Sequence, residues 1–171
     1  MIFSSIIKSD LGNKMKSKLI EIKDKKEKEK IGNLVLDDLT DWFSIGESRK
    51  TYIEESLDKR FLAIFLDDKP VGFLVMKETS KDCVEIFVMG IMKKYHRLGL
   101  GKQLIEAFED LARTLFFSYA QVKTVKRGTY EEYDKTNDFY KAMAYKELEC
   151  LPGLWDENNP CQLYIKYLGE K

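Results

Sequence analysis

The spacing of hydrophobic and polar residues separates a helical first part of the chain from a β-rich remainder. Met1 to Ile7 is a short apolar run, typical of an edge strand. Leu11 to Lys30 carries charges of alternating sign, which predicts a solvated helix face, and Gly32-Asn33 breaks this pattern. Apolar residues at helical spacing then run from Leu34 to Leu57, and Gly46 divides them into two predicted short helices.

Continuous apolar runs after Arg60 predict strands that are buried on both faces. Phe61 to Leu66 and Val71 to Met76 flank the turn residues Asp67-Asp68-Lys69-Pro70, so they are expected to form a hairpin. Val84 to Ile91 predicts a third strand.

A helical period follows, in which one apolar stripe is formed by Leu104, Ile105, Phe108, Leu111, Ala112, Leu115 and Phe116. Ala120 to Val125 predicts a short strand. Thr136 to Met143 predicts a second helix, with Thr136 as the N-cap candidate. Tyr145 to Leu151 and Gln162 to Leu168 predict the last two strands.

This order of elements predicts the fold class. A strand, helix, strand crossover makes the strands at Val84 and Ala120 parallel neighbours, and the other strands can pair as antiparallel hairpins. We therefore expect an α/β (α+β) fold with a mixed central β-sheet of about six to seven strands, flanked by helices on both faces.

Composition narrows the function classes. The chain has 171 residues, with 44% hydrophobic and 34% charged residues, which is typical of a globular protein. Lys+Arg and Asp+Glu are both 29, and this balance argues against a nucleic-acid partner and, more weakly, against a membrane surface. Met1 to Asp10 does not resemble a signal peptide, and no apolar stretch reaches the ~20 residues of a membrane span, so a cytoplasmic location is expected.

Cysteine and histidine usage gives no sign of metal binding or covalent chemistry. Cys83, Cys150 and Cys161 match no metal or disulfide spacing, and they are interpreted as reduced thiols without a base to activate them. His96 is the only histidine, so it has no second imidazole with which to hold a metal. We expect no metal site.

The segment from Val84 to Gln103 carries the clearest chemical signal. A buried strand runs into a turn that contains Gly99 and Gly101 and then into a helix. The first-turn amides of a helix have no internal partner, and the helix dipole adds positive charge, so this turn can bind a phosphate or pyrophosphate flanked by Arg97 and Lys102. A Gly-x-Gly before a helix is equally typical of a plain tight turn. The turn fits neither a P-loop nor a dinucleotide-binding fold, because the latter requires a third glycine where Leu104 stands.

Three motifs in this order resemble the GCN5-related N-acetyltransferase (GNAT) superfamily, in its small single-domain bacterial type. His96-Arg97-Leu98-Gly99-Leu100-Gly101 resembles the family's Q/R-x-x-G-x-G/A loop, with His96 in place of Gln or Arg. Val84 to Ile91 is similar to the family's fourth strand in its histone-acetylating branch. Asn137 to Tyr145 resembles the "FYxxxGF" helix end, with Ala144-Tyr145 in place of Gly-Phe.

The resemblance implies a single N-acetyltransferase domain over residues 1–171 that uses acetyl-CoA as acyl donor, without a metal. Residues 60–171 would form the core that binds acetyl-CoA, and residues 1–59 would lie on the acceptor side. The implied coenzyme-binding residues are Met89, Gly90, Ile91, His96, Arg97, Leu98, Gly99, Leu100, Gly101, Lys102, Gln103, Asn137 and Tyr140. Met89 would offer its backbone N–H to the acyl oxygen, and Gly90 fits a bulge there. Asn137 would either reach the pantetheine or cap the helix, and His96 would be a loop residue near phosphate.

Glu85 and Tyr140 are the candidate catalytic residues. A lysine-like amine has a pKa of about 10.4, so a base must remove its proton. Glu85 lies within an apolar strand, where burial suits a carboxylate to act as that base, directly or through water. The alternative is a glutamate that faces water or pairs with a lysine. Tyr140 would protonate the departing sulfur, and the alternative is a core tyrosine.

The resemblance also implies where the acceptor binds. Three segments there combine acidic and aromatic residues, which suits a small cationic amine such as a polyamine or aminoglycoside, although solvated loops would look the same. They comprise Asp37, Asp38, Asp41, Trp42, Phe43 and Glu47; Tyr130, Glu131, Glu132, Tyr133 and Asp134; and Trp155, Asp156 and Glu157. The competing functions are a protein or peptide N-acetyltransferase and a non-catalytic acyl-CoA sensor, either as a monomer or as a homodimer.

Overall fold

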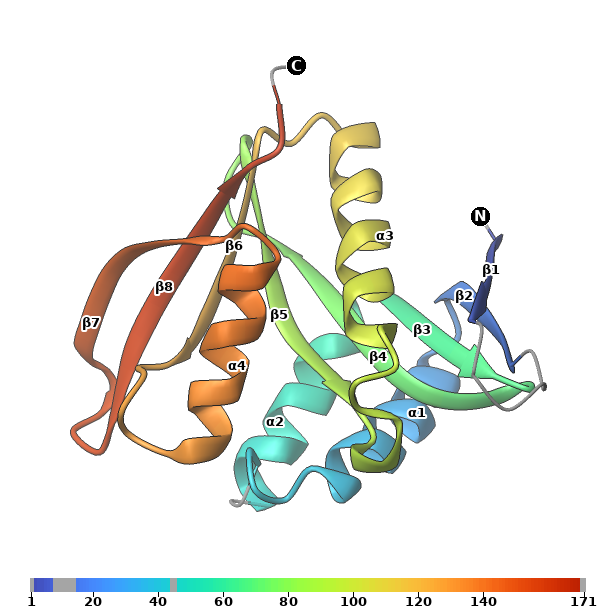
Figure 1. The fold of residues 1–171 in the computed structure, drawn as a ribbon, viewed down its shortest axis with the longest axis horizontal. Helices are drawn as coiled ribbons and strands as arrows, with labels where there is room; N and C mark the ends of the chain where they lie inside the picture. The colour runs from blue at the N-terminus through green and yellow to red at the C-terminus, as the bar shows by residue number, and fades with distance from the viewer. Residues whose placement is uncertain (1, 8–14, 44–45, 170–171) are drawn as a thin grey trace. The chain divides into compact units, whose positions relative to one another are not determined.

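The computed structural model describes residues 2–7, 15–43 and 46–169 (Figure 1). The chain divides into two compact units, each of which is described by itself below. The first unit comprises Met1–Met76 with Val88–Phe108, and the second comprises Lys77–Phe87 with Glu109–Lys171. The expectation of a single domain over residues 1–171 stays a prediction.

The first unit contains an antiparallel run of strands and two helices that pack side by side. Its elements are β1 (Ile2–Ile7), β2 (Met15–Ile22), α1 (Lys25–Asp38), α2 (Gly46–Ser56), β3 (Arg60–Leu66), most of β4 (Lys69–Glu78), the end of β5 (Cys83–Ile91), the short 3-10 turn η1 (Lys93–Tyr95) and the first part of α3 (Leu100–Thr114). β1 to β4 pair in chain order, each antiparallel to the next.

The second unit contains the beginning of β5, the last turns of α3, and the elements β6 (Tyr119–Val125), α4 (Glu131–Ala142), β7 (Lys146–Asp156) and β8 (Asn159–Tyr167). β5 pairs in parallel with β6, as the sequence predicts, while β6 with β8 and β8 with β7 are antiparallel. In Figure 1, α4 lies alongside β6 and β8. The hydrogen-bonded strand order is β1-β2-β3-β4-β5-β6-β8-β7, so the expected mixed sheet is confirmed, with eight strands among the described residues.

The additional strand is β2, where the sequence predicts a charged helix over Leu11 to Lys30. Residues 11–14 of that range lie outside the described part, but Met15–Ile22 is a strand and helix α1 begins only at Lys25. Ser17 and Leu19 are buried and pair with Leu66 and Ile64 of β3. The lysines that alternate with these buried residues obscure the two-residue strand pattern in the sequence. Pairing with a buried strand outweighs the low intrinsic preference of lysine for strands.

Helix α1 also passes through Gly32, where the sequence predicts a break. A Cβ atom at this position would lie 2.4 Å from Ile53 Cδ1 of α2. The glycine therefore permits a close approach of the two helices instead of ending the first one. Asp24 caps the helix by accepting a hydrogen bond from the Glu27 amide at 2.9 Å.

The last predicted helix and loop also differ from the structure. Helix α4 begins at Glu131, so Thr136 is not its N-cap; the Thr136 hydroxyl donates to the Glu132 carbonyl inside the helix. β7 extends to Asp156 and β8 begins at Asn159, so most of the predicted loop belongs to the β7–β8 hairpin. Asp156 stabilises the turn by accepting a hydrogen bond from the Asn158 amide at 2.8 Å. Strand ends predicted from apolar runs alone do not take such a side-chain contact into account.

Glu109 of α3 is a buried acid that ties the helix to the end of β8. Both of its carboxylate oxygens accept hydrogen bonds from Lys166 Nζ at 2.8 Å, and Arg113 Nη2 lies 3.5 Å away. Arg113 Nε donates to the Leu168 carbonyl at 3.0 Å. These bonds offset the free-energy cost of removing the Glu109 carboxylate from water.

Lys166→Met is expected to lower the free energy of unfolding by about 2 to 3 kcal/mol. The value lies below that of a fully buried pair because Arg113 remains beside Glu109 and because the Lys166 side chain is 21% exposed. Urea unfolding measures it. Lys102→Met, which removes an exposed pair with Glu106, is the control and should change the free energy by no more than about 0.5 kcal/mol. Equal effects of the two variants would contradict the role given to the Glu109 cluster.

Candidate active site

The turn between β5 and α3 has the geometry of an anion-binding site. Arg97 and Gly99 both have left-handed backbones, with φ of 65° and 76°. Helix α3 begins at Leu100, and its first backbone bond runs from the Gln103 amide to the Gly99 carbonyl at 3.1 Å. The amides at 100–102 precede that bond, so the helix cannot satisfy them, and left-handed residues before a helix turn successive N–H groups toward one side. These residues fit the diphosphate-binding role that the sequence predicts.

His96 links this turn to the end of β5. Its Nε2 lies 2.6 Å from the carbonyl oxygen of Ile91. A carbonyl oxygen only accepts, so Nε2 carries the hydrogen in this contact. The ring also meets the Trp42 ring edge-on, with 5.9 Å between the centroids. His96 therefore stabilises the turn. This structural role explains the histidine at this position, and no proton transfer by His96 is needed.

The start of η1 is fixed by two aspartates, one at the last residue of α1 and one just after it. The Lys93 amide donates to Asp38 Oδ2 at 2.6 Å, and Lys93 Nζ pairs with Asp41 Oδ2 at 2.5 Å. Asp37 pairs with Arg49 at 3.1 Å. Three acids that were expected to attract a cationic acceptor therefore already have partners in the chain.

Gly90 is required by packing within the first unit. A Cβ atom there would lie 2.6 Å from Leu39 Cδ1 and 3.0 Å from Val35 Cγ1. The sequence interpretation instead took this glycine as fitting a bulge. Close approach of α1 to β5 explains it directly, and Met89 and Ile91 remain candidates for coenzyme contacts through their backbones.

The remaining residues of the turn differ in what their side chains do. Leu100 is buried in the core, and Leu98 is half-buried. Gln103 Oε1 accepts from the Ser17 hydroxyl at 2.9 Å, so this side chain braces β2. Arg97 and Lys102 are exposed, and Lys102 lies 3.7 Å from Glu106. Arg97 and Lys102 are thus the cations of the turn that can meet an anion from solvent.

Glu85 lies in the second unit and is paired with a lysine. It is 5% exposed, and its Oε2 accepts from Lys123 Nζ at 2.6 Å and from Gln121 Nε2 at 3.0 Å. Both partners come from β6, in which Gln121 is the direct cross-strand neighbour of Glu85. Sequence reasoning missed Lys123 and Gln121. The signal was available, because residues 121 and 123 share one face of a strand predicted to lie parallel to that of Glu85.

Asn137 is fully buried and makes three hydrogen bonds within the second unit. Its Nδ2 donates to the Val125 carbonyl at 2.9 Å and to the Tyr133 carbonyl at 2.6 Å, and its Oδ1 accepts from the Tyr164 hydroxyl at 2.6 Å. It stands inside α4, so it does not cap the helix. Its bonds to the Val125 carbonyl and the Tyr164 hydroxyl hold α4 on β6 and β8, and both of its amide hydrogens are used.

Tyr140 follows Asn137 by one helical turn. It is 5% exposed, and its ring contacts the rings of Phe139, Tyr145 and Tyr164 at centroid distances of 5.5, 6.1 and 6.3 Å. Burial raises the pKa of Tyr140 well above its ordinary value, so the phenol keeps its proton at neutral pH. Among the described residues its hydroxyl has no hydrogen-bond partner. It can therefore donate to a group that arrives with a ligand.

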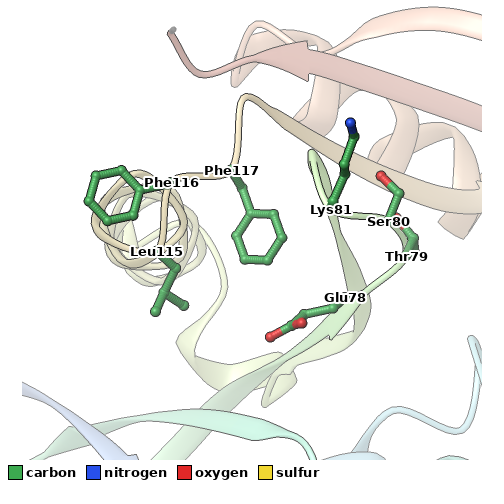
Figure 2. A pocket seen from close by; sticks show the side chains of 7 residues that line it. All are labelled: Glu78, Thr79, Ser80, Lys81, Leu115, Phe116 and Phe117. Carbon is green, nitrogen blue, oxygen red and sulfur yellow. The ribbon is translucent and has the colours of Figure 1, made fainter. Parts of the chain in front are cut away.

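A surface pocket of about 440 Å³ lies elsewhere in the second unit, between the β4–β5 turn and the end of α3. Figure 2 shows the Phe117 ring and the Glu78 carboxylate pointing into it, while the Phe116 ring points away. The hydroxyls of Thr79 and Ser80 already bond to the backbone of the turn at Cys83. The pocket contains none of the predicted site residues.

Cys83 and Cys161 are not activated. Burial raises the pKa of Cys161 to about 11 and also raises that of Cys83, so both thiols stay protonated at neutral pH. In the described ranges, no three His, Cys, Asp or Glu side chains gather as metal ligands. No helix in the same ranges is long and apolar enough to cross a membrane.

Comparison with known proteins identifies the family. The sequence profile of the acetyltransferase (GNAT) family matches residues 29–145, so the chain belongs to this family. It is a GNAT acetyltransferase, and the family uses acetyl-CoA as its donor. No curated protein sequence matches the chain.

Solved structures share the fold at low sequence identity. A putative GNAT-family acetyltransferase from Desulfovibrio desulfuricans matches with a TM-score of 0.77 and 12% identity, over 90% of this chain and 99% of that one. An aminoglycoside 6′-N-acetyltransferase complexed with coenzyme A matches with 0.68 and 15%, over 90% and 98%. The ribosomal-protein-S18-alanine N-acetyltransferase from Escherichia coli matches with 0.69 and 11%, over 91% and 96%.

Proposed function

We propose that the chain moves an acetyl group from acetyl-CoA directly to the primary amine of a small, cationic acceptor. The observation that carries this proposal is the turn at residues 97–102. Its two left-handed residues and the unsatisfied first-turn amides of α3 suit a diphosphate. Family membership makes coenzyme A the diphosphate to expect.

The coenzyme would supply the activated acetyl thioester, and the chain would supply its position. The backbone amides at 97–102 would bind the diphosphate, with Arg97 and Lys102 as flanking cations. The backbone of Ile91 would hold the pantetheine arm in the manner of a neighbouring strand. The Met89 amide would donate to the acyl oxygen and stabilise its developing negative charge. Asn137 would act indirectly, since its hydrogen bonds fix the helix that carries Tyr140.

Glu85 would serve as the base and Tyr140 as the acid. The Glu85 carboxylate is buried and ionically paired with Lys123, so an incoming ammonium or a bound water must displace that contact before Glu85 takes a proton. Tyr140 would donate its proton to the departing sulfur. Its raised pKa keeps the phenol protonated before the reaction begins.

The acceptor would be held by those acids that lack an internal partner. Asp37, Asp38 and Asp41 are engaged within the first unit. Among the acids predicted for this role, no hydrogen bond or ion pair within the described ranges engages the carboxylates of Glu47, Glu132 and Glu157. Together with aromatic neighbours such as the Tyr130–Tyr133 pair, they favour a cation over a neutral or acidic acceptor.

Titration calorimetry and a thiol-release assay test this function. We expect heat from both coenzyme A and acetyl-CoA, and release of thiol with polyamines or aminoglycosides but not with peptides. Release only with peptides would instead support a protein N-acetyltransferase, and binding without release on any amine would support an acyl-CoA sensor. The absence of heat from either form of the coenzyme would contradict the whole assignment.

A further inference from the structure

The Lys123–Glu85 pair places an amine of the chain itself against the proposed base. Lys123 Nζ lies 2.6 Å from Glu85 Oε2, and the two side chains are 26% and 7% exposed. Gln121 holds the same carboxylate oxygen from a second direction at 3.0 Å. A general base must lie within hydrogen-bond reach of the proton it removes, and Lys123 meets that condition without any external ligand.

We propose that Lys123 is a site of self-acetylation, at which the chain's own amine takes the acetyl group when no external acceptor is present. This inference rests on the proposed function, since it needs acetyl-CoA as donor and Glu85 as base. It goes beyond that function because it assigns a modification to a residue of this chain.

The chemistry balances without any further reactant. The Lys123 ammonium gives one proton to the Glu85 carboxylate. Lys123 Nζ then forms a bond to the thioester carbonyl carbon and displaces the sulfur. The sulfur leaves with the electron pair of the broken carbon–sulfur bond and is protonated by Tyr140 or water. Glu85 takes one Nζ proton and solvent takes the other, so the products are Nζ-acetyl-Lys123 and free coenzyme A, with nothing oxidised or reduced.

The chain contains a matched internal control in Lys166. This lysine also pairs with a buried glutamate, Glu109, at 2.8 Å, and the two side chains are 21% and 5% exposed. Chemical acetylation by a reactive thioester in solution depends on exposure and on the amine, so it treats the two lysines alike. Acetylation that needs the active site distinguishes them.

The experiment uses the full chain with acetyl-CoA and no added amine. Binding of coenzyme A is first established by calorimetry on the same sample, and acetylation at each lysine is then followed by peptide mass spectrometry. We expect Lys123 to be acetylated at least about tenfold faster than Lys166. Glu85→Gln should slow Lys123 by about 100-fold and leave Lys166 unchanged. The Lys123 rate should not depend on protein concentration, because the reaction is intramolecular.

A stability measurement gives a second readout. Acetylation removes the positive charge of Lys123 and leaves Glu85 buried without its cation. The acetylated chain should therefore unfold at a lower urea concentration than the untreated chain. Lys123→Gln should show a similar decrease without acetyl-CoA.

Equal acetylation rates at Lys123 and Lys166 would overturn the inference. An unmodified Lys123 in a sample that binds coenzyme A would do the same, and the proposed function would stand. If coenzyme A does not bind at all, both the inference and the proposed function are contradicted. If Glu85→Gln does not fold, the ratio of the two lysines in the unaltered chain decides alone.

Discussion

Gly99→Val is expected to weaken coenzyme A binding by at least about 100-fold. The substitution has two separate costs. A β-branched residue at φ of 76° is strained in the free chain, and the valine methyl groups would stand where the diphosphate must approach the backbone. Loss of two charge-assisted hydrogen bonds, at about 1.5 to 3 kcal/mol each, is enough for the predicted change. Isothermal titration with coenzyme A measures it.

Gly128→Val separates the two costs. Gly128 also has a left-handed backbone, with φ of 86°, and a Cβ atom at either glycine would meet no described residue within 4 Å. The two variants should therefore lose similar stability from strain, on the order of 1 to 2 kcal/mol. Only the one at Gly99 should lose coenzyme affinity. Tight binding by the Gly99 variant, or equal loss in both variants, would show that the turn at residues 97–102 does not hold the diphosphate.

The strands that the sequence predicts best are those whose two faces are both buried. Phe61–Leu66, Val71–Met76 and Val84–Ile91 are apolar enough for local pattern to agree with tertiary environment, and all lie in observed strands. β2 was missed because its burial is decided by pairing with β3 and not by its own composition. Gly32 was misread for a related reason, since only the neighbouring Ile53 explains a glycine inside a helix.

The candidate site, like the fold, has one part that the sequence predicts and another part that depends on tertiary contacts. The backbone role of the turn was predictable, because glycines before a helix indicate accessible backbone N–H groups, whatever the neighbouring side chains are. The side-chain partners were less so. The pairing of Asp38 and Asp41 with Lys93 depends on contacts between segments far apart in the chain. The bond from His96 to the Ile91 carbonyl depends on the path of the turn between them. For Glu85 the sequence left open a pairing with lysine, and the structure selects Lys123.

Tyr140→Phe is expected to lower kcat by about 100-fold or more while leaving acetyl-CoA affinity nearly unchanged. The ring makes all the packing contacts of this residue with Tyr145 and Tyr164, and a phenylalanine keeps them. Because the hydroxyl has no hydrogen-bond partner within the described ranges, its removal should change the free energy of unfolding by no more than about 0.5 kcal/mol. Thiol release with the best amine of the panel gives kcat, and calorimetry gives the affinity.

Tyr145→Phe is the matched control for this hydroxyl. Tyr145 is also buried, contacts the Tyr140 ring at 6.1 Å, and has a buried hydroxyl oxygen for which the described part of the chain offers no partner within hydrogen-bond geometry. Burial, with the negative Glu109 nearby, raises the pKa of Tyr145 as well, so both phenols are protonated at neutral pH. If protonation of the departing sulfur is specific to Tyr140, only its variant loses kcat. An unaltered kcat in Tyr140→Phe would make it a core tyrosine, and equal losses in both variants would mean that the contribution to catalysis is not specific to the Tyr140 hydroxyl.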